Sequence, residues 1–166
     1  MNNVNTRGVL FIHSAPRSLC KHIQWMISNV LNTEIKLQWT EQPLDDKFYR
    51  TDLSWVGPVG TGAKLASAMR GWEHLRYEVT EEATLTTDAG RWLHTPDLGI
   101  FYAQMDRCGN MVVSENRIRH VLEYENEPQK MIHELKLALG KAWDDELEPF
   151  RYASDGNNLH WLHYTK

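Results

Sequence analysis

The fold is decided by the stretch from Gly8 to Asn32, which reads GVLFIHSAPRSLCKHIQWMISNVLN. Val9 to Ile12 is apolar without alternation, which is typical of a central strand buried on both faces. A polar turn follows, with Ser14 as a helix N-cap and Pro16 at the first helical position. One apolar stripe then recurs every three or four residues and predicts an amphipathic helix; it consists of Leu19, Ile23, Met26, Ile27 and Val30.

The segments that follow continue the alternation of strands and helices. Residues 34–40, 49–55 and 75–79 alternate apolar and polar side chains, which predicts three half-buried strands. Residues 61–72 carry apolar side chains at helical spacing. The order strand, helix, strand, strand, helix, strand predicts a ferredoxin-like βαββαβ unit, an α+β fold with both helices on one face of a four-stranded antiparallel sheet.

The second half of the chain predicts an extension of this unit. Residues 91–95, 98–105 and 111–113 are expected strands, and two helices are expected after Ser114 and near Pro128. Residues 150–153 and 159–164 flank an Asp-Gly pair, which predicts a C-terminal hairpin. We therefore divide the chain into a ferredoxin-like half, residues 1–82, and an α+β extension packed on it, residues 83–166. The alternative is one continuous domain.

Charge and composition exclude several classes of protein. The net charge is −4, and 18 basic residues are dispersed among 22 acidic ones, so we expect no nucleic-acid partner. No apolar stretch approaches the roughly 20 residues that span a bilayer, and the N-terminus has no signal-peptide core. We expect a cytoplasmic protein with no membrane association. The two cysteines, Cys20 and Cys108, agree with a reducing compartment.

Four stretches together resemble one known family. They are RGVLFIHSAP, LASAMRGWEHLRYEVTEE, TPDLGIF and AWDDELEPFRYA, at residues 7–16, 65–82, 95–101 and 142–153. The chain resembles an actinobacterial family of uncharacterised proteins, domain of unknown function 3145. The resemblance implies a single bacterial protein with one continuous family architecture, and it carries over no catalytic residue and no ligand.

The turn between the first strand and the first helix is one candidate site. Helix N-termini present free N–H groups that bind anions, and four residues there add donors: His13, Ser14, Arg17 and Ser18. The turn lacks the glycines of a phosphate-binding loop. The alternative is that Ser14 only caps the helix.

The polar face of the predicted sheet is the second candidate site. Six residues are expected on the side away from the two helices: Lys36, Arg50, Asp52, His74, Arg76 and Glu78. Such a face serves dimerisation or ligand contact in other proteins with this fold, which is an analogy from fold alone. The alternative is that the C-terminal half covers this face and buries some of its charges in pairs.

Three further features carry weaker indications. The run of acids from Asp144 to Glu148 is expected to be a solvated edge or a patch for a basic partner. Within the fold, either the preceding helix runs further, or the acids start a new helical turn, or they are held by cations such as Arg151. His160 and His163 lie three apart on an expected strand, where side chains face opposite sides, so we assign no metal. Cys20 is expected to be a buried helix residue and not a reactive thiol.

The function that the sequence favours is a non-catalytic module that binds a small molecule or a protein. The partners that we expect are a second copy of the chain and a small anionic ligand, and we assign no cofactor. The alternative is an enzyme of unknown reaction, with an anion-binding site at the turn between the first strand and the first helix.

Overall fold

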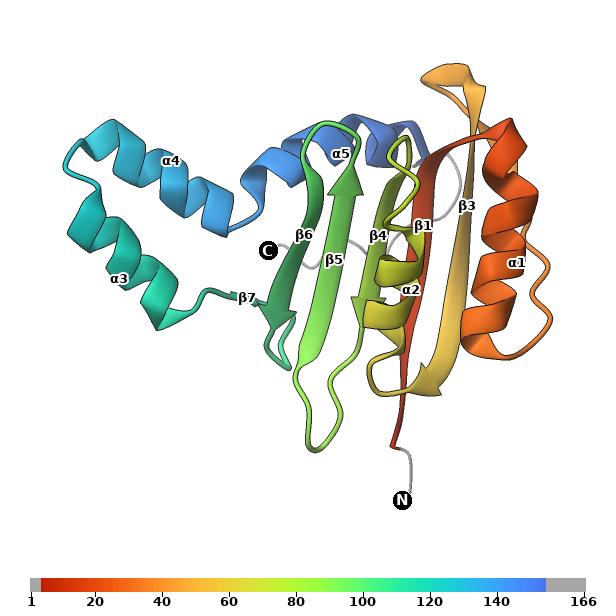
Figure 1. Ribbon diagram of the computed structural model, residues 1–166, viewed down its shortest axis with the longest axis horizontal. Helices are drawn as coiled ribbons and strands as arrows, with labels where there is room; N and C mark the ends of the chain where they lie inside the picture. Colours follow the sequence, from red (N-terminus) through yellow and green to blue (C-terminus); the bar gives the residue numbers. More distant parts are fainter. Residues whose placement is uncertain (1–3, 155–166) are drawn as a thin grey trace.

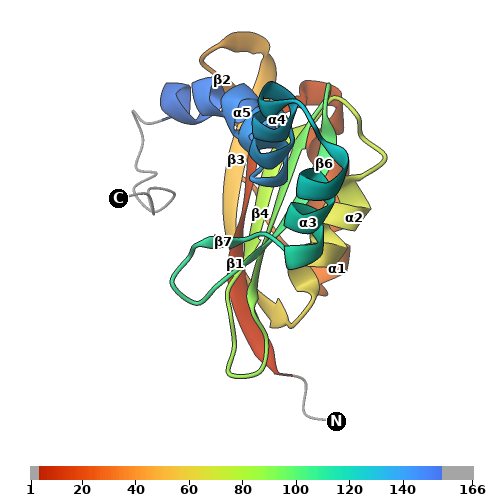
Figure 2. The ribbon, with the colours of Figure 1, turned by 90° about the vertical axis from the view of Figure 1, so that its left-hand side faces the viewer.

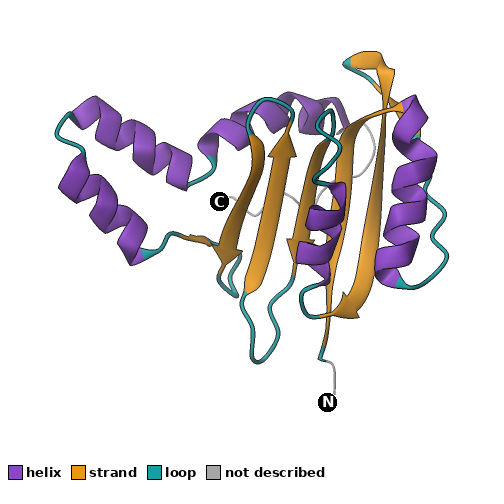
Figure 3. Cartoon of the chain, viewed as in Figure 1, coloured by secondary structure: helices purple, strands orange, loops and turns teal. Residues whose placement is uncertain are grey.

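A computed structural model of the protein describes residues 4–154 (Figures 1 and 3). Within that range the chain forms strands, α-helices and one 3-10 helix. In chain order these are β1 Asn5–Pro16, the 3-10 helix η1 Arg17–Leu19, α1 Cys20–Leu31, β2 Thr40–Gln42, β3 Asp45–Pro58, α2 Thr61–Met69, β4 Arg76–Glu81, β5 Ala89–Thr95, β6 Gly99–Met105, β7 Met111–Val112, α3 Glu115–Tyr124, α4 Pro128–Ala138 and α5 Lys141–Ser154.

The strands form one antiparallel sheet in the order β2-β3-β1-β4-β5-β6-β7. The prediction of an α+β fold is confirmed. The apolar run in β1 is central, and Leu10, Phe11 and Ile12 are buried as expected. The sheet has seven strands and not four, because β5 of the predicted extension pairs directly with β4.

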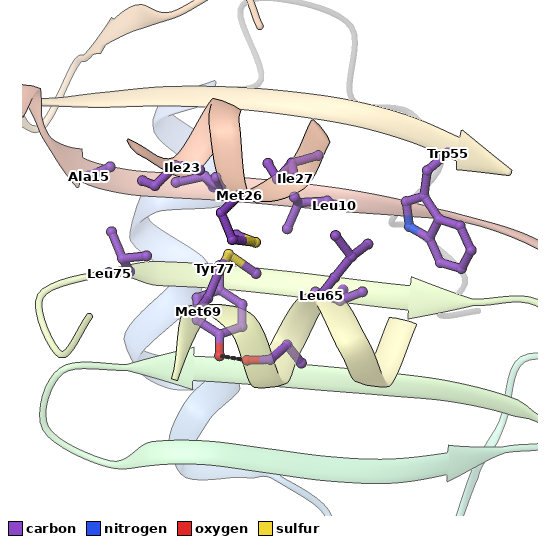
Figure 4. Close-up of a cluster of buried hydrophobic side chains, with 13 residues drawn as sticks. Leu10, Ala15, Ile23, Met26, Ile27, Trp55, Leu65, Met69, Leu75 and Tyr77 are labelled. Atoms are coloured by element: carbon purple, nitrogen blue, oxygen red, sulfur yellow. Dashed lines mark hydrogen bonds between the residues drawn. The ribbon is translucent and has the colours of Figure 1, made fainter. Parts of the chain in front are cut away.

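One face of the sheet is covered by α1 and α2, and the main apolar core lies between them (Figures 1 and 4). Ile23 and Ile27 of α1 and Leu65 of α2 pack in one cluster with Leu10 and Tyr77 of the sheet. Each such side chain contributes about 1.5–3 kcal/mol when fully buried. The Tyr77 hydroxyl donates to the Ala66 carbonyl oxygen at 3.1 Å, so the one polar atom of this ring has a partner.

The opposite face is crossed by α5, which packs on β1, β2 and β5 (Figure 2). The expected strand at residues 150–153 is therefore wrong, since these residues lie in α5. Trp143, Leu147 and Phe150 follow a helical i, i+4, i+7 row, and Leu147 is fully buried. Asp144 lies in the first turn, where a negative charge interacts favourably with the helix dipole and stabilises the helix. The expected strand at residues 159–164 lies outside the described residues.

A β-bulge in β1 changes which side chains share a face. The pairing register shifts between Ile12 and Ala15 against β3, and both residues pack in the core beside α1 and α2. His13 and Ser14 instead contact residues on the α5 face of β4. The predicted helix start at Ser14 is wrong, because β1 continues to Pro16 and keeps pairing with β3. Ser14 is a buried strand residue and caps no helix.

The expected strand at residues 34–40 is also wrong, because β2 begins only at Thr40. Ile35, Leu37 and Trp39 do pack against the core, as their alternation indicates. The backbone N–H groups of Ile35 and Leu37, however, donate to the side-chain oxygens of Ser28 and Gln24 on α1, at 3.0 Å each. Partners on a helix thus replace the ladder of hydrogen bonds that a strand would form.

Candidate functional site

A buried cluster of charges joins the α5 face of the sheet to α5. The carboxylate of Glu78 is fully buried in β4. Its Oε1 accepts from His13 Nε2 at 2.9 Å and from Arg151 Nε at 2.5 Å. Its Oε2 accepts from Arg91 Nη2 at 2.9 Å. Asp144 of α5 bridges the two guanidinium groups, at 3.3 Å from Arg91 and 2.9 Å from Arg151.

The partners of Glu78 determine its protonation state. Burial alone would raise the pKa of this carboxyl. The hydrogen bond and charge of His13, with the charges of Arg151 and Arg91, outweigh burial and hold the pKa of Glu78 well below its usual range. For Arg151, burial would lower the pKa, but the charges of Glu78 and Asp144 raise it. Glu78 and Arg151 therefore stay ionised, and their contact fastens α5 to the sheet.

The contacts of α5 show that the C-terminal half covers part of the polar sheet face. Glu78 is covered by α5, and the Arg76 guanidinium lies 4.5 Å from the centre of the Phe150 ring on that helix. For these two residues, the C-terminal half of the chain covers the face and pairs its charges. His74 lies before β4, exposed to solvent.

Three other residues of the predicted face come together at a pocket of about 360 Å³, which we call the β3-edge pocket. The pairing of β2 with β3 extends only from Asp45 to Arg50, and the segment before Thr40 diverges from β3. The pocket lies at this fork. It is lined by Phe11, Ile12, His13, Lys36, Leu37, Gln38, Thr40, Arg50, Thr51, Asp52 and Leu53.

The pocket combines an exposed polar rim with a buried interior. Lys36 and Asp52 belong to the exposed rim, whereas Thr51 is 8% exposed. Two lining residues, Arg50 and Thr51, each have a buried polar atom, Nε and Oγ1, with no hydrogen-bond partner among residues 4–154. As neighbours in β3, the two side chains leave the strand on opposite sides of the sheet. A guanidinium N–H can only donate. Arg50, on the polar side of β3, can therefore donate to a ligand that carries acceptor oxygens.

The four residues predicted at the first turn do not share one site. His13 pairs with Glu78, and Ser14 Oγ accepts from Arg76 Nη1 at 3.3 Å. Arg17 lies over the Tyr49 ring, 5.9 Å from its centre, and Ser18 is exposed in η1. Only His13 lines the β3-edge pocket. Anion binding by this set remains a prediction.

The N-terminus of α2 holds a carboxylate from the chain itself. Glu81 of β4 accepts from the backbone N–H of Gly60 at 2.8 Å and from that of Gly62 at 2.6 Å. Gly60 adopts a φ of +92°, a left-handed conformation that glycine tolerates. Glu81 therefore occupies the place where an external anion would bind this helix.

Other reactive or metal-binding groups contribute little to this region. Cys20 and Cys108 are free thiols, and burial raises the pKa of Cys20, which disfavours the reactive thiolate. Within residues 4–154, no group of three or more His, Cys, Asp or Glu side chains is arranged to hold a metal ion. No helix in this range is long and apolar enough to cross a membrane.

Sequence reasoning missed Thr51 and the two arginines, Arg91 and Arg151. Thr51 lies on the core side of the alternation in β3, where nothing distinguishes it from an ordinary strand threonine. The sequence suggests Arg151 only as a partner for the neighbouring acids at residues 144–148. One signal in the sequence points to these contacts. Glu78 is expected on the polar sheet face, and residues 141–151 contain both acidic and basic side chains that could pair with it.

Fold and pocket define an α+β protein built on a single antiparallel sheet, with a polar pocket at an open strand edge. The chain belongs to the family described as "Protein of unknown function (DUF3145)", whose model matches residues 9–164. The family assignment from the four quoted stretches is thereby confirmed. No curated protein and no solved structure matches the chain.

Proposed function

We propose that the protein is a binding module for a small organic acid, held in the β3-edge pocket by an oxyanion group. The observation that carries this proposal is that two residues lining the pocket, Arg50 and Thr51, each have a buried polar atom, Nε and Oγ1, without a partner among residues 4–154. A buried polar group without a partner costs about 1–3 kcal/mol, and a ligand oxygen removes that cost.

The charge of the lining supports an anion over a cation. Lys36 and Arg50 bring two positive charges, and Asp52 brings one negative charge. Arginine binds carboxylates and phosphates through two parallel N–H groups. The carboxyl and the phosphate-ester forms of a ligand share this chemistry, and the experiment below separates them.

The apolar lining supports an organic ligand over a free inorganic ion. Leu37 and Leu53 contribute apolar atoms beside the donors. A volume of about 360 Å³ is in the range of small-molecule sites. Because His13 Nε2 is already bonded to Glu78, the pocket favours binding over proton transfer.

We also infer a ferredoxin-like arrangement for the unit from β1 to β4. Its support is the order β2-β3-β1-β4 with antiparallel pairing, and the position of α1 and α2 on one face. In that arrangement a ligand can bind the opposite face only where α5 does not cover it. Phe11, His13, Arg50 and Asp52, which alternate toward that face, all line the pocket.

A thermal-shift titration tests the proposed ligand class. The probes are butyrate, inorganic phosphate and butylamine. At about 100 times the dissociation constant, we expect butyrate to raise the melting temperature by about 5–10 °C. Butylamine should produce no shift. A shift with phosphate that exceeds the one with butyrate would assign the phosphate-ester form.

The matched variants are Arg50→Gln in the pocket and Arg70→Gln at the end of α2, where the side chain is exposed. Arg50→Gln should weaken oxyanion binding at least about tenfold, and Arg70→Gln should leave it unchanged. The proposed function is wrong if butyrate and phosphate each raise the melting temperature of the wild-type protein no more than they raise that of Arg50→Gln.

A further inference from the structure

The β3-edge pocket contains an acid as well as two bases. Among the described residues that line it, Lys36 and Arg50 are basic and Asp52 is acidic. Asp52 is exposed and forms no ion pair with any residue in the range 4–154. A carboxylate at this place repels a ligand that carries only negative charge. The acid therefore affects which class of organic acid the pocket selects.

Arg50 and Asp52 are held on the same side of β3. They lie two residues apart in the strand, so their side chains leave it in the same direction, about 7 Å apart along its axis. No ion pair joins the two, and Arg50 Nε has no hydrogen-bond partner in the described part of the chain. Two opposite charges thus line one pocket without neutralising each other. A small ligand that carries both signs can pair with both.

The remaining lining restricts the rest of the ligand. Leu37 and Leu53 contribute apolar atoms, and the volume of about 360 Å³ suits a small molecule. An α-amino acid carries its carboxylate and its ammonium group on one carbon atom, so it presents both charges within a small volume. A dicarboxylic acid would place a second negative charge near Asp52, and a simple monocarboxylic acid would leave Asp52 without a cationic partner.

We infer that the ligand of the β3-edge pocket is a zwitterionic amino acid with a small apolar side chain. Arg50 and Lys36 bind its carboxylate, and Asp52 binds its ammonium group through a charge-assisted hydrogen bond. This inference rests on the proposed function of the same pocket and narrows its ligand class. Asp52 is then the residue that determines specificity, because it favours an amino acid over a simple acid.

The test is a calorimetric titration of the full chain with L-2-aminobutyrate, butyrate and butylamine. The three probes share the same carbon chain and differ only in their charged groups. We expect L-2-aminobutyrate to bind with a dissociation constant about tenfold lower than that of butyrate. Butylamine should show no measurable binding, because it lacks the carboxylate that Arg50 and Lys36 recognise.

Asp52→Asn removes the negative charge and keeps the size of the side chain. It should reduce the preference for L-2-aminobutyrate over butyrate to about twofold or less, because binding of the amino acid weakens and that of butyrate does not. Damage to the fold would weaken both ligands and leave their ratio unchanged. The matched control is Asp46→Asn, an exposed acid of the same strand outside the pocket lining, which should keep the full preference.

The outcomes separate this inference from the proposed function. If butyrate binds the wild-type protein as tightly as L-2-aminobutyrate does, the inference is wrong and the binding of an organic acid stands. A preference for the amino acid that persists in Asp52→Asn would also overturn it. If none of the three probes binds, the proposed function is wrong and the inference is wrong with it.

Discussion

Glu78 Oε1 lies 2.5 Å from Arg151 Nε, and this contact joins β4 to α5 across 73 residues of sequence. The other oxygen of Glu78 accepts from Arg91 of β5, and His13 of β1 bonds to Oε1, so one carboxylate joins three strands and a helix. The segment after β7 reaches the sheet through α5. Glu78 thus holds α5 on the sheet together with the buried side chain of Leu147 and the contact between Asp144 and Arg91.

Replacing that acid should strongly destabilise the protein. Glu78→Gln leaves Arg91 and Arg151 partly buried with only Asp144 as a carboxylate partner, and breaking such a buried pair costs up to about 3–5 kcal/mol of unfolding free energy. Urea denaturation measures this change. Glu82→Gln is the control, because the Glu82 pair with Arg7 is largely exposed and should contribute little. Equal stability of the two variants would contradict the role given to Glu78.

Acid should weaken the same contact. The folded-state pKa of Glu78 is lowered, so the unfolded chain takes up the proton first as the pH falls. The stabilisation is therefore complete above about pH 4.3, the ordinary value for glutamate, and is lost as the pH falls through the folded-state pKa. Between pH 5 and pH 3, the free energy of unfolding of the wild-type protein should decrease more steeply than that of Glu78→Gln. The difference between the two slopes should correspond to the uptake of at most about one proton on unfolding. Parallel profiles would exclude this assignment.

Thr51→Val separates ligand binding from stability. The Thr51 hydroxyl is buried without a partner among the described residues, so a methyl group in its place should leave stability unchanged or raise it by about 1 kcal/mol. The same change should weaken butyrate binding. Thr61→Val is the matched control, because the Thr61 hydroxyl donates to the Pro58 carbonyl oxygen at 2.6 Å. That variant should lose about 1 kcal/mol, as measured by urea denaturation. If Thr51→Val lowers the free energy of unfolding, the Thr51 hydroxyl has a hydrogen-bond partner and the prediction is wrong.

Gly8→Ala tests the close approach of β1 to β4. A Cβ atom at Gly8 would lie 1.8 Å from the Thr80 carbonyl oxygen, which belongs to the backbone and cannot rotate away. We expect a loss of about 3 kcal/mol or more, measured by thermal unfolding. Gly71→Ala is the control, since a Cβ atom there meets nothing within 4 Å. Similar melting temperatures for the two variants would contradict the described strand register.

Sequence patterns predicted the elements whose apolar residues face the core at regular spacing. The apolar run in β1 and the helical rows of α1 and α2 reappear at the expected positions, because each buries its own apolar face. The alternation at residues 34–40 was misleading. Those side chains do alternate toward the core, but side chains of α1 satisfy the backbone, which no pattern in the segment reveals.

The candidate site was less predictable because its parts meet through the fold. Lys36, Arg50 and Asp52 were expected on one polar face, and they do line one pocket. The bulge after Ile12 was not visible in the sequence, and it moved Ser14 from a helix cap into the sheet. The partners of Glu78 lie 13, 65 and 73 residues away, so sequence spacing alone gave no means of pairing them.

The most direct test of the β3-edge pocket is a titration of the isotope-labelled protein with butyrate, followed by backbone amide chemical shifts. We predict that the largest changes occur at residues 36–40 and 50–53 and that Thr51→Val reduces them. Changes that are scattered over the surface, or that centre on η1 and Arg17, would contradict the assignment of the pocket.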